Sequence, residues 1–311
     1  MVDFDDVRRA AERLRGRVRR TPTMRALVPT PGGEVEVVLK LEQTQLSGTF
    51  KDRGMVNALL RAKETDRLPA AGVVIASGGN AGIAVAIAGR TLGVPVTVTT
   101  ARDVAAVKVQ RIRSLGATVL DHFVDHPTSN TEADKLAERT GAMRLHAFDH
   151  PDVVTGAGTL LLEAQEQEPG LNAVLVSVGG GGLLAGTLLA GQPSDIRTAA
   201  VEPVGAPTLH AALAAGEPVD ITADTIAKDS LGAGRIGTVP WQVCRDADLE
   251  SVLVTDDAIV TAQHYLWDTY RLLVEPSAAC PVAAVMTGAY RPGAGELPLF
   301  VLCGANVTSP F

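Results

Sequence analysis

The sequence predicts an α/β fold in which mostly parallel sheets are covered by helices. Apolar runs alternate with alanine-rich stretches, and two of these runs, at 72–76 and 171–178, pass through a glycine-rich turn into a predicted helix. Such alternation is typical of parallel sheets, whose strands are buried on both faces. With 311 residues and 46% hydrophobic content, the chain can bury a large core and has about the length of two domains.

Charge and cysteine content exclude several classes of protein. The net charge of -7 leaves no basic surface for nucleic acid, and no apolar run reaches the roughly twenty residues that cross a membrane. No secretory signal opens the sequence, and the arginines between Arg8 and Arg20 are mixed with acids, which indicates a charged surface helix rather than a transit peptide. The 3 cysteines form no metal-ligand pair and leave an odd thiol. We therefore expect a cytoplasmic protein that binds neither nucleic acid nor membrane.

The most informative segment is residues 47–54, Ser-Gly-Thr-Phe-Lys-Asp-Arg-Gly, which follows an extended apolar run at 35–41. It places Lys51 at the start of a predicted helix, among small and apolar residues. A partly desolvated lysine loses proton affinity and becomes a nucleophile for a carbonyl. Lys51 is therefore a candidate for covalent binding of an aldehyde cofactor, although most lysines are solvated charges on a helix face.

A second segment, residues 77–82 with the sequence Ser-Gly-Gly-Asn-Ala-Gly, lies between the apolar run at 72–76 and a helix predicted over 83–92. A strand that enters a helix through glycines leaves backbone amides free at the helix start, which suits an anion such as a substrate carboxylate. Asn80 adds an amide that can donate to a phenolate-like oxygen. The same pattern also fits an ordinary turn between strand and helix.

A third segment joins the apolar run at 171–178 to four consecutive glycines at 179–182 and a further predicted helix. Four glycines let several backbone N–H groups converge on one phosphate. The stretch also matches a dinucleotide-binding pattern, because Gly180, Gly182 and Ala185 have G-x-G-x-x-A spacing and Glu202 follows about twenty residues later. An NAD-binding oxidoreductase is therefore an alternative.

Near the C-terminus, an apolar run at 299–302 leads into Cys303-Gly304-Ala305-Asn306. In an open parallel sheet, the carboxyl ends of the strands face the ligand crevice, so Cys303 is placed to contact the same ligand as the glycine loop. The competing interpretation is a buried free cysteine that only fills the core.

These four segments, in this order, resemble the fold-type II pyridoxal phosphate enzymes and, within them, the serine/threonine dehydratases. The resemblance covers nearly the whole chain, from Arg20-Thr21-Pro22 to the Cys303 motif, and includes Val201-Glu202-Pro203 and Val274-Glu275-Pro276-Ser277. The Ser-Gly-Gly-Asn-Ala-Gly sequence and the cysteine in the last motif are most similar to the short catabolic L-serine dehydratases. This family implies a two-domain, tryptophan synthase β-like fold and, by habit, a homodimer.

The resemblance implies a role for each matched position. Lys51 binds the cofactor aldehyde covalently and serves as the catalytic residue, Phe50 lies against one face of the pyridine ring, and Asn80 bonds the ring hydroxyl. Cys303 lies beside the ring nitrogen. The phosphate is held by Gly179, Gly180, Gly181, Gly182 and the amide of Leu183, and the substrate carboxylate is surrounded by Ser77, Asn80 and Ala81.

The implied reaction is β-elimination from L-serine or L-threonine, which yields ammonia and pyruvate or 2-oxobutyrate. The freed amine of Lys51 takes the Cα proton as a general base. A neutral thiol beside the ring nitrogen holds less positive charge there than a carboxylate would, which favours prompt loss of the β-hydroxyl over transamination. The cofactor phosphate, with a second pKa of about 6, is a suitable acid for the departing hydroxide.

Departures from the family pattern bear on the alternatives. Racemases of the family carry a serine at the position of Gly78, so racemisation is not expected. Ser230 falls near where the short dehydratases place a small apolar residue, which leaves a bulkier β-hydroxy amino acid open as the substrate. The Lys-Asp-Arg-Gly sequence is also similar to threonine synthases and cysteine synthases, which catalyse replacement reactions, whereas the four glycines favour the dehydratases.

The resemblance also implies a cation site. Glu202, Ala206 and Thr208 match the spacing at which related dehydratases hold a cation, with backbone carbonyls near Leu231 and Ala233 completing the site. Carboxylate, carbonyl and hydroxyl oxygens are hard ligands, which favours potassium, or magnesium or calcium, over zinc. The competing interpretation of Glu202 is an ordinary carboxylate at a strand end with a basic partner nearby.

We predict a small domain at residues 45–140, which carries Lys51 and the Asn80 loop, and a large domain at 1–44 plus 141–311, which carries the glycine loop and Cys303. The cofactor would lie between the domains, whose closure over substrate excludes water. The main loop-like stretches are predicted at 127–130 and 216–237. Pro127 is expected to keep His122 and His126 off a helix, so this pair is not expected to bind metal.

Overall fold

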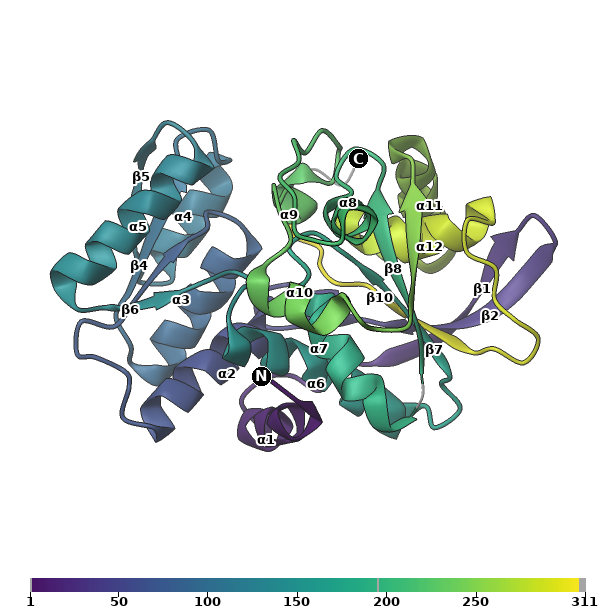
Figure 1. Cartoon of the computed structure of the whole chain (residues 1–311), viewed down its shortest axis with the longest axis horizontal. Helices are drawn as coiled ribbons and strands as arrows, with labels where there is room; N and C mark the ends of the chain where they lie inside the picture. The colour runs from purple at the N-terminus through teal and green to yellow at the C-terminus, as the bar shows by residue number, and fades with distance from the viewer. Residues whose placement is uncertain (1, 195, 308–311) are drawn as a thin grey trace.

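The computed structural model of the chain describes residues 2–194 and 196–307. Its strands form two separate sheets, one of six strands and one of four. Figure 1 shows the four-stranded sheet on the left and the six-stranded sheet on the right, with helices packed around each and between them. The α/β fold class predicted from the sequence is therefore confirmed.

The six-stranded sheet has the order β1-β2-β10-β7-β8-β9. Its first two strands form an antiparallel hairpin, and all other neighbouring strands are parallel. The strands are β1 (Thr23–Thr30), β2 (Gly33–Lys40), β7 (Ala173–Ser177), β8 (Arg197–Pro203), β9 (Leu249–Val254) and β10 (Pro298–Val301). The central strands β7 and β10 are buried along their whole length, as expected for parallel strands covered on both faces.

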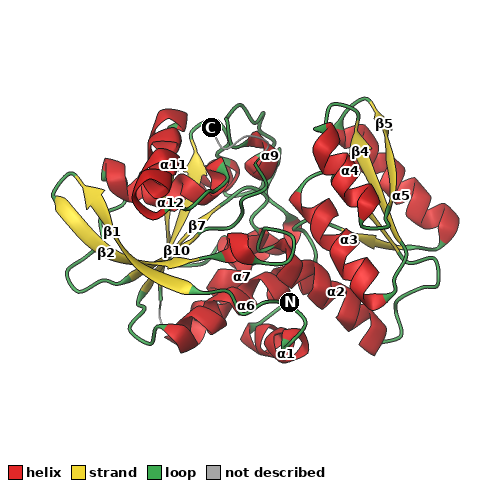
Figure 2. Cartoon of the chain, turned by 180° about the vertical axis from the view of Figure 1, so that it is seen from behind, coloured by secondary structure: helices red, strands yellow, loops and turns green. Residues whose placement is uncertain are grey.

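Helices cover both faces of this sheet. Figures 1 and 2 show α11 (Asp256–Tyr270) and α12 (Pro276–Thr287) on one face, and α6 (Pro151–Gln167) and α7 (Gly182–Gly191) on the other. The predicted charged N-terminal helix is α1 (Phe4–Leu14), which buries Val7, Ala10 and Leu14. The remaining helices of this part are α8 (Thr208–Ala215), α9 (Lys228–Leu231), α10 (Thr238–Cys244) and the 3-10 turns η1 (Glu42–Thr44) and η2 (Gln192–Ser194).

The four-stranded sheet is wholly parallel, with the order β5-β4-β3-β6. Its strands are β3 (Val73–Ala76), β4 (Val96–Ala101), β5 (Thr118–Phe123) and β6 (Met143–Leu145), and its helices are α2 (Lys51–Glu64), α3 (Asn80–Leu92), α4 (Ala106–Ser114) and α5 (His126–Thr140). Because β6 belongs to this sheet, the sheet extends past residue 140, where the sequence places the domain boundary. The domain limits themselves stay a prediction.

The loop predicted at 127–130 is wrong, because these residues form the first turn of α5. Asp125 caps the helix by accepting a hydrogen bond from the Thr128 amide, and Pro127 sits where a helix needs no backbone N–H. His126 therefore begins a helix, whereas His122 lies in β5, so the two histidines do not share one helix face. The second predicted loop, at 216–237, contains only the short helix α9.

Three helices pack backbone to backbone behind the site. A β-carbon on Gly156 of α6 would lie 2.5 Å from the carbonyl oxygen of Arg53 in α2, and one on Gly158 would lie 2.3 Å from the carbonyl oxygen of Gly186 in α7. Glycine at these positions lets α6 hold α2 on one side and α7 on the other. Within the described residues, no helix is both long and apolar enough to cross a membrane.

Candidate active site

The lysine segment and the cysteine motif, far apart in the sequence, lie side by side. Thr49 and Gly304 form an antiparallel bridge, the Phe50 amide donates to the Cys303 carbonyl at 3.0 Å, and the Ala305 amide donates to the Gly48 carbonyl at 3.0 Å. The loop before α2 is thereby attached to the chain that leaves β10. This pairing brings together two of the four predicted motifs.

Lys51 is the first residue of α2, and its side chain is half-buried. Its Nζ donates to the carbonyl oxygen of Ala147 at 2.9 Å and lies 4.9 Å from the centroid of the Phe50 ring. Burial lowers the pKa of this amine from 10.5 to about 8, although the carboxylate of Glu275 opposes the shift. About one tenth of the amine is therefore uncharged at pH 7, far more than for a solvated lysine, and the uncharged form is the one that a nucleophile or base requires.

A buried ionic cluster fixes the start of α2. The guanidinium of Arg53 binds both oxygens of Glu42, with Nε and NH2 at 2.8 and 2.7 Å, and NH2 also lies 2.9 Å from Oε1 of Glu163. The buried amine of Lys40 donates to the same Glu163 oxygen at 2.6 Å. These contacts join η1, α2, α6 and the end of β2, so they determine where Lys51 emerges from its helix.

The asparagine loop joins β3 to α3, and Asn80 is the first residue of that helix. Its amide nitrogen lies 3.0 and 2.9 Å from the two carboxylate oxygens of Glu275, and its amide oxygen accepts from Nδ2 of Asn306 at 2.9 Å. A β-carbon on Gly78 would lie only 2.2 Å from the hydroxyl oxygen of Thr100. The space beside Gly78 is therefore already filled by a side chain from β4.

The glycine loop between β7 and α7 leaves no space for side chains. Gly181 has a φ of +86°, which favours glycine, and a β-carbon on Gly180 would lie 2.3 Å from the ring of Phe148. The backbone amides of residues 179–183 have no hydrogen-bond partner among the described residues. Free amides at a helix N-terminus bind anions, so this loop fits a phosphate group.

Cys303 follows β10 at the carboxyl edge of the large sheet. Its thiol is buried and lies 3.6 Å from the hydroxyl of Ser277. Burial, together with the charge of Glu275, raises the pKa of the thiol to about 12. Cys303 is thus a neutral group at physiological pH.

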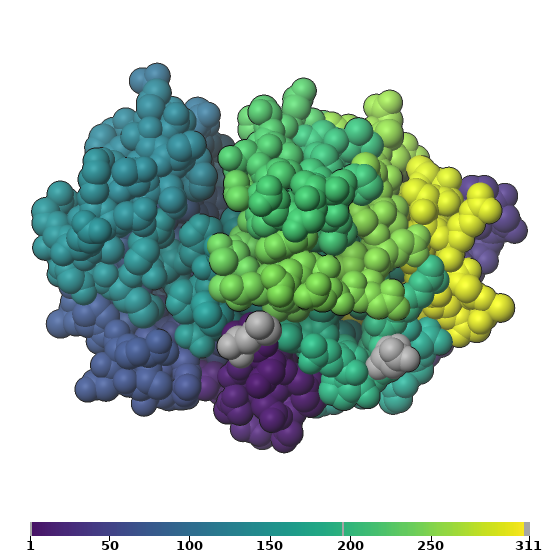
Figure 3. Space-filling model, in the orientation of Figure 1, coloured from purple at the N-terminus to yellow at the C-terminus, as the bar shows by residue number. Residues whose placement is uncertain are grey.

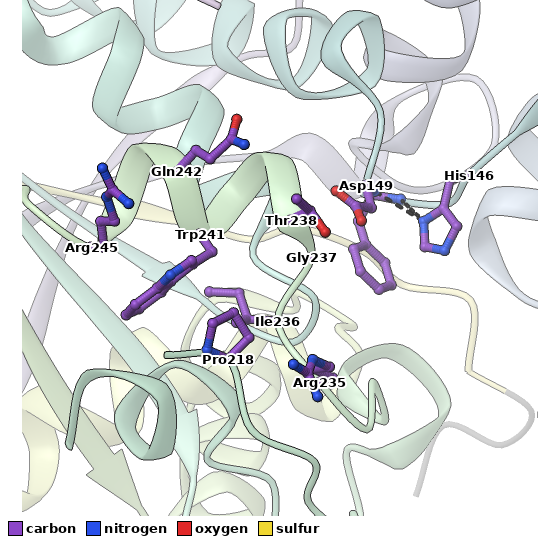
Figure 4. Close-up of a pocket in the computed structure, with 11 residues that line it drawn as sticks. His146, Asp149, Pro218, Arg235, Ile236, Gly237, Thr238, Trp241, Gln242 and Arg245 are labelled. Atoms are coloured by element: carbon purple, nitrogen blue, oxygen red, sulfur yellow. Dashed lines mark hydrogen bonds between the residues drawn. The ribbon is translucent and has the colours of Figure 1, made fainter. Parts of the chain in front are cut away.

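A hollow of about 400 Å³ adjoins the glycine loop. The space-filling view in Figure 3 shows a furrow between the two sheet regions. In Figure 4, Trp241 and Pro218 lie on one side of the lining and Asp149 on the other, with Arg235 below. The Gly237 amide at its wall donates to the carbonyl of Gly180 at 3.1 Å. Burial lowers the pKa of His146, another lining residue, to about 4, so that imidazole is uncharged at neutral pH.

The residues predicted for a cation lie behind the glycine loop. The hydroxyl of Thr208 is 3.0 Å from Glu202 Oε1 and also contacts the Gly179 carbonyl. Ala206 lies in the turn before α8, where its carbonyl accepts from the Thr208 amide at 3.1 Å. Leu231 packs with its backbone against Gly179, whereas Ala233 lies in the loop after α9.

Glu202 is fully buried, and both of its oxygens are already in use. Oε1 accepts from the Leu209 amide and Oε2 from the His210 amide, both at 2.8 Å, so the carboxylate caps α8. A dinucleotide ribose would need an accessible carboxylate at this position. The packing of Glu202 therefore disfavours the NAD-binding alternative.

For several residues that contact the predicted site, the sequence motifs predict no role. Glu275 precedes Pro276 at the start of α12, and the only signal was its place in the Val-Glu-Pro-Ser motif. Arg111 of α4 reaches Asn306 from the other sheet region, which no motif indicates. The carbonyl of Ala147 accepts a hydrogen bond from Lys51, and a contact to the backbone cannot be recognised from the residue type.

Comparisons with known proteins agree with this geometry. The family model described as "Pyridoxal-phosphate dependent enzyme" matches residues 14–304. An L-threo-3-hydroxyaspartate ammonia-lyase of Pseudomonas sp is 35% identical over 313 residues, which cover 99% of this chain and 96% of that protein. The structure of a threonine deaminase from T.th. matches with a TM-score of 0.87, 30% identity and 99% of both chains. A serine racemase from Dictyostelium discoideum matches with a TM-score of 0.89, 29% identity and 99% of both chains.

Proposed function

Because the chain belongs to the family of pyridoxal-phosphate dependent enzymes and has the fold of its type II members, we propose that it is an ammonia-lyase for L-serine and L-threonine. The substrate loses its Cα proton and its β-hydroxyl, which leave together as water. Water then hydrolyses the released enamine to ammonia and a 2-oxo acid, pyruvate from serine or 2-oxobutyrate from threonine.

The described residues fit the cofactor that the family requires. The free amides of residues 179–183 suit a phosphate, the amine of Lys51 suits an aldehyde, and the amide of Asn80 suits a ring hydroxyl. Phe50 offers an aromatic face beside Lys51, and Cys303 offers a neutral partner for a ring nitrogen. When bound, pyridoxal phosphate supplies an electron sink for negative charge that develops at Cα.

The side chains then divide the work of binding and proton transfer. The amine of Lys51 accepts the Cα proton. Its pKa of about 8 lies close to neutral pH, which makes it an efficient general base there. Ser77, in the loop before α3, and Asn80 and Ala81, at its start, hold the substrate carboxylate. The furrow between the two sheet regions lets closure exclude water from these groups.

Two observations support elimination over the other reactions of the family. The neutral thiol of Cys303 provides no negative charge that would hold a proton on a ring nitrogen, so charge at Cα is relieved by loss of the β-substituent. Thr100 fills the space beside Gly78, where a racemase of the family would carry its second serine. The observation that carries the proposal is that the Lys51 loop is attached to the Cys303 motif, while Lys51 binds the carbonyl of Ala147, whose neighbour Phe148 packs against the glycine loop.

The hollow beside the glycine loop supports a second candidate substrate. It is lined by Arg235, and it adjoins Phe148, the neighbour of the Ala147 carbonyl that binds Lys51. An arginine there suits a substrate with a side-chain carboxylate. This agrees with the similar ammonia-lyase of Pseudomonas sp, which is named for L-threo-3-hydroxyaspartate.

We also propose a cation behind the glycine loop, a homodimer and a cytoplasmic location. Glu202, Ala206 and Thr208 supply hard oxygen atoms for potassium, magnesium or calcium, with the backbones of Leu231 and Ala233 as further ligands. The homodimer rests on the family resemblance. A cytoplasmic location is supported by three buried cysteines, none of which is in a disulfide within the described residues.

The deciding experiment is release of 2-oxo acid from L-serine, L-threonine and L-threo-3-hydroxyaspartate, with pyridoxal phosphate and potassium present. We expect turnover of at least one of the first two, and loss of turnover and of cofactor colour in Lys51→Ala. Lys63→Ala is the matched control, because Lys63 is exposed on the same helix and its amine donates to the Leu92 carbonyl, away from the site. D-serine formation without 2-oxo acid would refute the elimination.

A further inference from the structure

A continuous line of polar side chains crosses the cleft through Asn80. NH1 of Arg111 donates to Oδ1 of Asn306 at 2.8 Å, and Nδ2 of Asn306 donates to Oδ1 of Asn80 at 2.9 Å. Nδ2 of Asn80 then lies 3.0 and 2.9 Å from the two oxygens of Glu275. We refer to these four residues as the amide relay.

The two ends of the amide relay determine the orientation of both amides in between. A guanidinium can only donate, so the side of Asn306 that faces Arg111 must be its oxygen. A carboxylate can only accept, so the side of Asn80 that faces Glu275 must be its nitrogen. Neither amide can flip without placing two donors or two acceptors against each other.

This arrangement leaves Asn80 one free donor. The two oxygens of one carboxylate lie in nearly the same direction from the Asn80 nitrogen, so they share a single N–H. The amide oxygen of Asn80 is occupied by Asn306. The second N–H of the half-buried Asn80 amide is thus the part of this side chain that remains for a ligand.

Glu275 is held as firmly as the amide that it orients. It is 5% exposed, and besides Asn80 it accepts from the Asn306 amide at 2.8 Å and from the Ser277 hydroxyl at 3.3 Å. Within the described ranges 2–194 and 196–307, no ion pair joins Glu275 to a cation. A buried carboxylate is costly unless nearby donors or cations compensate, and here the amide of Asn80 is one of the donors that do so, beside the positive charge of Lys51.

We propose that Arg111 and Glu275 are positioning residues that present one N–H of Asn80 to the ring hydroxyl of pyridoxal phosphate. This inference rests on the cofactor site of the proposed function. Arg111 and Asn80 belong to helices that pack on the four-stranded sheet. Asn306 follows β10 of the six-stranded sheet, and Glu275 directly precedes α12, which packs on that sheet. The donor is therefore correctly aimed only when the two sheet regions are close together, which couples cofactor binding to closure of the cleft.

The test measures cofactor binding to apoprotein, by quenching of tryptophan fluorescence and by the visible band of the bound cofactor. Glu275→Gln turns one carboxylate oxygen into an NH2 donor, which cannot accept from the Asn80 side chain or from the Asn306 amide, so the anchor of the Asn80 amide is weakened. Arg111→Met removes the other end and is exposed, so this variant is expected to fold. We expect each change to weaken cofactor binding, by about tenfold for Glu275→Gln and less for Arg111→Met, and to shift the pH midpoint of the visible band.

Two matched controls are available. Lys108→Met removes another α4 cation that crosses the cleft, to Asp229 at 2.7 Å, and Glu296→Gln changes a well-bonded carboxylate that precedes β10, at the end opposite the site. Both controls should bind cofactor like the wild type, with the same pH midpoint.

Unchanged affinity and pH midpoint in Glu275→Gln and Arg111→Met would overturn the proposal. A lower melting temperature with an unchanged midpoint would also overturn it, because that result describes a purely structural role. The readout does not depend on turnover: wild-type protein that binds cofactor but releases no 2-oxo acid would refute the lyase, while the binding comparison would still decide the role of the amide relay.

Discussion

At the scale of single residues, the environment of Lys51 sets the pH at which the protein reacts with an aldehyde. Only the uncharged amine attacks a carbonyl, and burial places the pKa of Lys51 at about 8 instead of 10.5. We expect the rate of covalent loading of apoprotein with pyridoxal phosphate to rise with pH and to level off above about 8. Stopped-flow absorbance would measure this rate, and Lys51→Arg should show no loading. A rate that still climbs near pH 10 would mean that the lysine is solvated.

The contact between Gly78 and Thr100 gives a second prediction at this scale. Serine at position 78 would place its β-carbon 2.2 Å from the Thr100 hydroxyl oxygen and 2.9 Å from a methyl of Val104. Overpacking of this kind costs about 1–3 kcal/mol, so Gly78→Ser should lower the melting temperature without producing D-serine. Adding Thr100→Ala should restore stability, because it removes the nearer contact. Racemisation by Gly78→Ser alone would show that Thr100 does not block this position.

At the scale of elements, the ionic cluster around Arg53 fixes the position of α2 relative to η1, α6 and β2. Arg53→Met leaves the carboxylate of Glu42 buried and without its guanidinium, and breaking such a pair costs about 3–5 kcal/mol. Urea unfolding should show this loss, and the double variant with Glu42→Gln should regain part of it. The control is Arg61→Met, a partly exposed position on the same helix that should change stability by less than about 0.5 kcal/mol. Equal effects of the two arginine changes would contradict a structural role for the cluster.

The elements that bear the motifs were predictable, because each motif is a local pattern. Glycines after the apolar runs predict turns at the ends of β3 and β7. In the structure, helices begin directly after these turns, at Asn80 and at Gly182. The prediction failed at Pro127, where a residue typical of loops also suits the first turn of a helix. Whether Asp125 caps that helix depends on backbone geometry that composition does not carry.

Contacts between distant elements could not be predicted from any single segment. Arg111 and Glu275 bracket two asparagines, yet they belong to α4 and to the start of α12. The Phe148 ring occupies the space above Gly180, which explains why that position has no side chain. Glu202 has the spacing of a ribose ligand, and only its burial beneath α8 distinguishes a capping carboxylate from a binding one.

At the scale of the whole molecule, the two sheets meet through few polar bridges at the front of the cleft and through close helix packing behind it. The helices α2, α6 and α7 touch at glycines, so they form a rigid back wall. In front, the amide relay and the ion pair between Lys108 and the exposed Asp229 cross the cleft. Side-chain bridges can break and re-form more easily than backbone packing, so opening for substrate should occur at the front, about the back wall.

The buried Glu202 links the stability of the whole protein to pH and to the proposed cation. Burial raises the pKa of Glu202 from 4.5 to about 7, so the folded protein binds this proton more tightly than the unfolded chain. The protonated carboxyl of Glu202 therefore contributes to the free energy of unfolding. This stabilisation is fully present below about pH 4.5 and is lost as pH rises through about 7, a change of about 3 kcal/mol. A cation favours the ionised carboxylate and opposes this loss.

We therefore expect potassium to raise the melting temperature of the protein at pH 8 but not at pH 5, where Glu202 is protonated and offers no charge to a cation. Glu202→Gln should abolish the potassium effect and flatten the dependence of stability on pH between about 4.5 and 7. Differential scanning calorimetry at the two pH values, with sodium as the matched salt, would measure both effects. An equal gain at pH 5 and pH 8, or a gain that persists in Glu202→Gln, would place the cation elsewhere and leave Glu202 with its capping role at α8 alone.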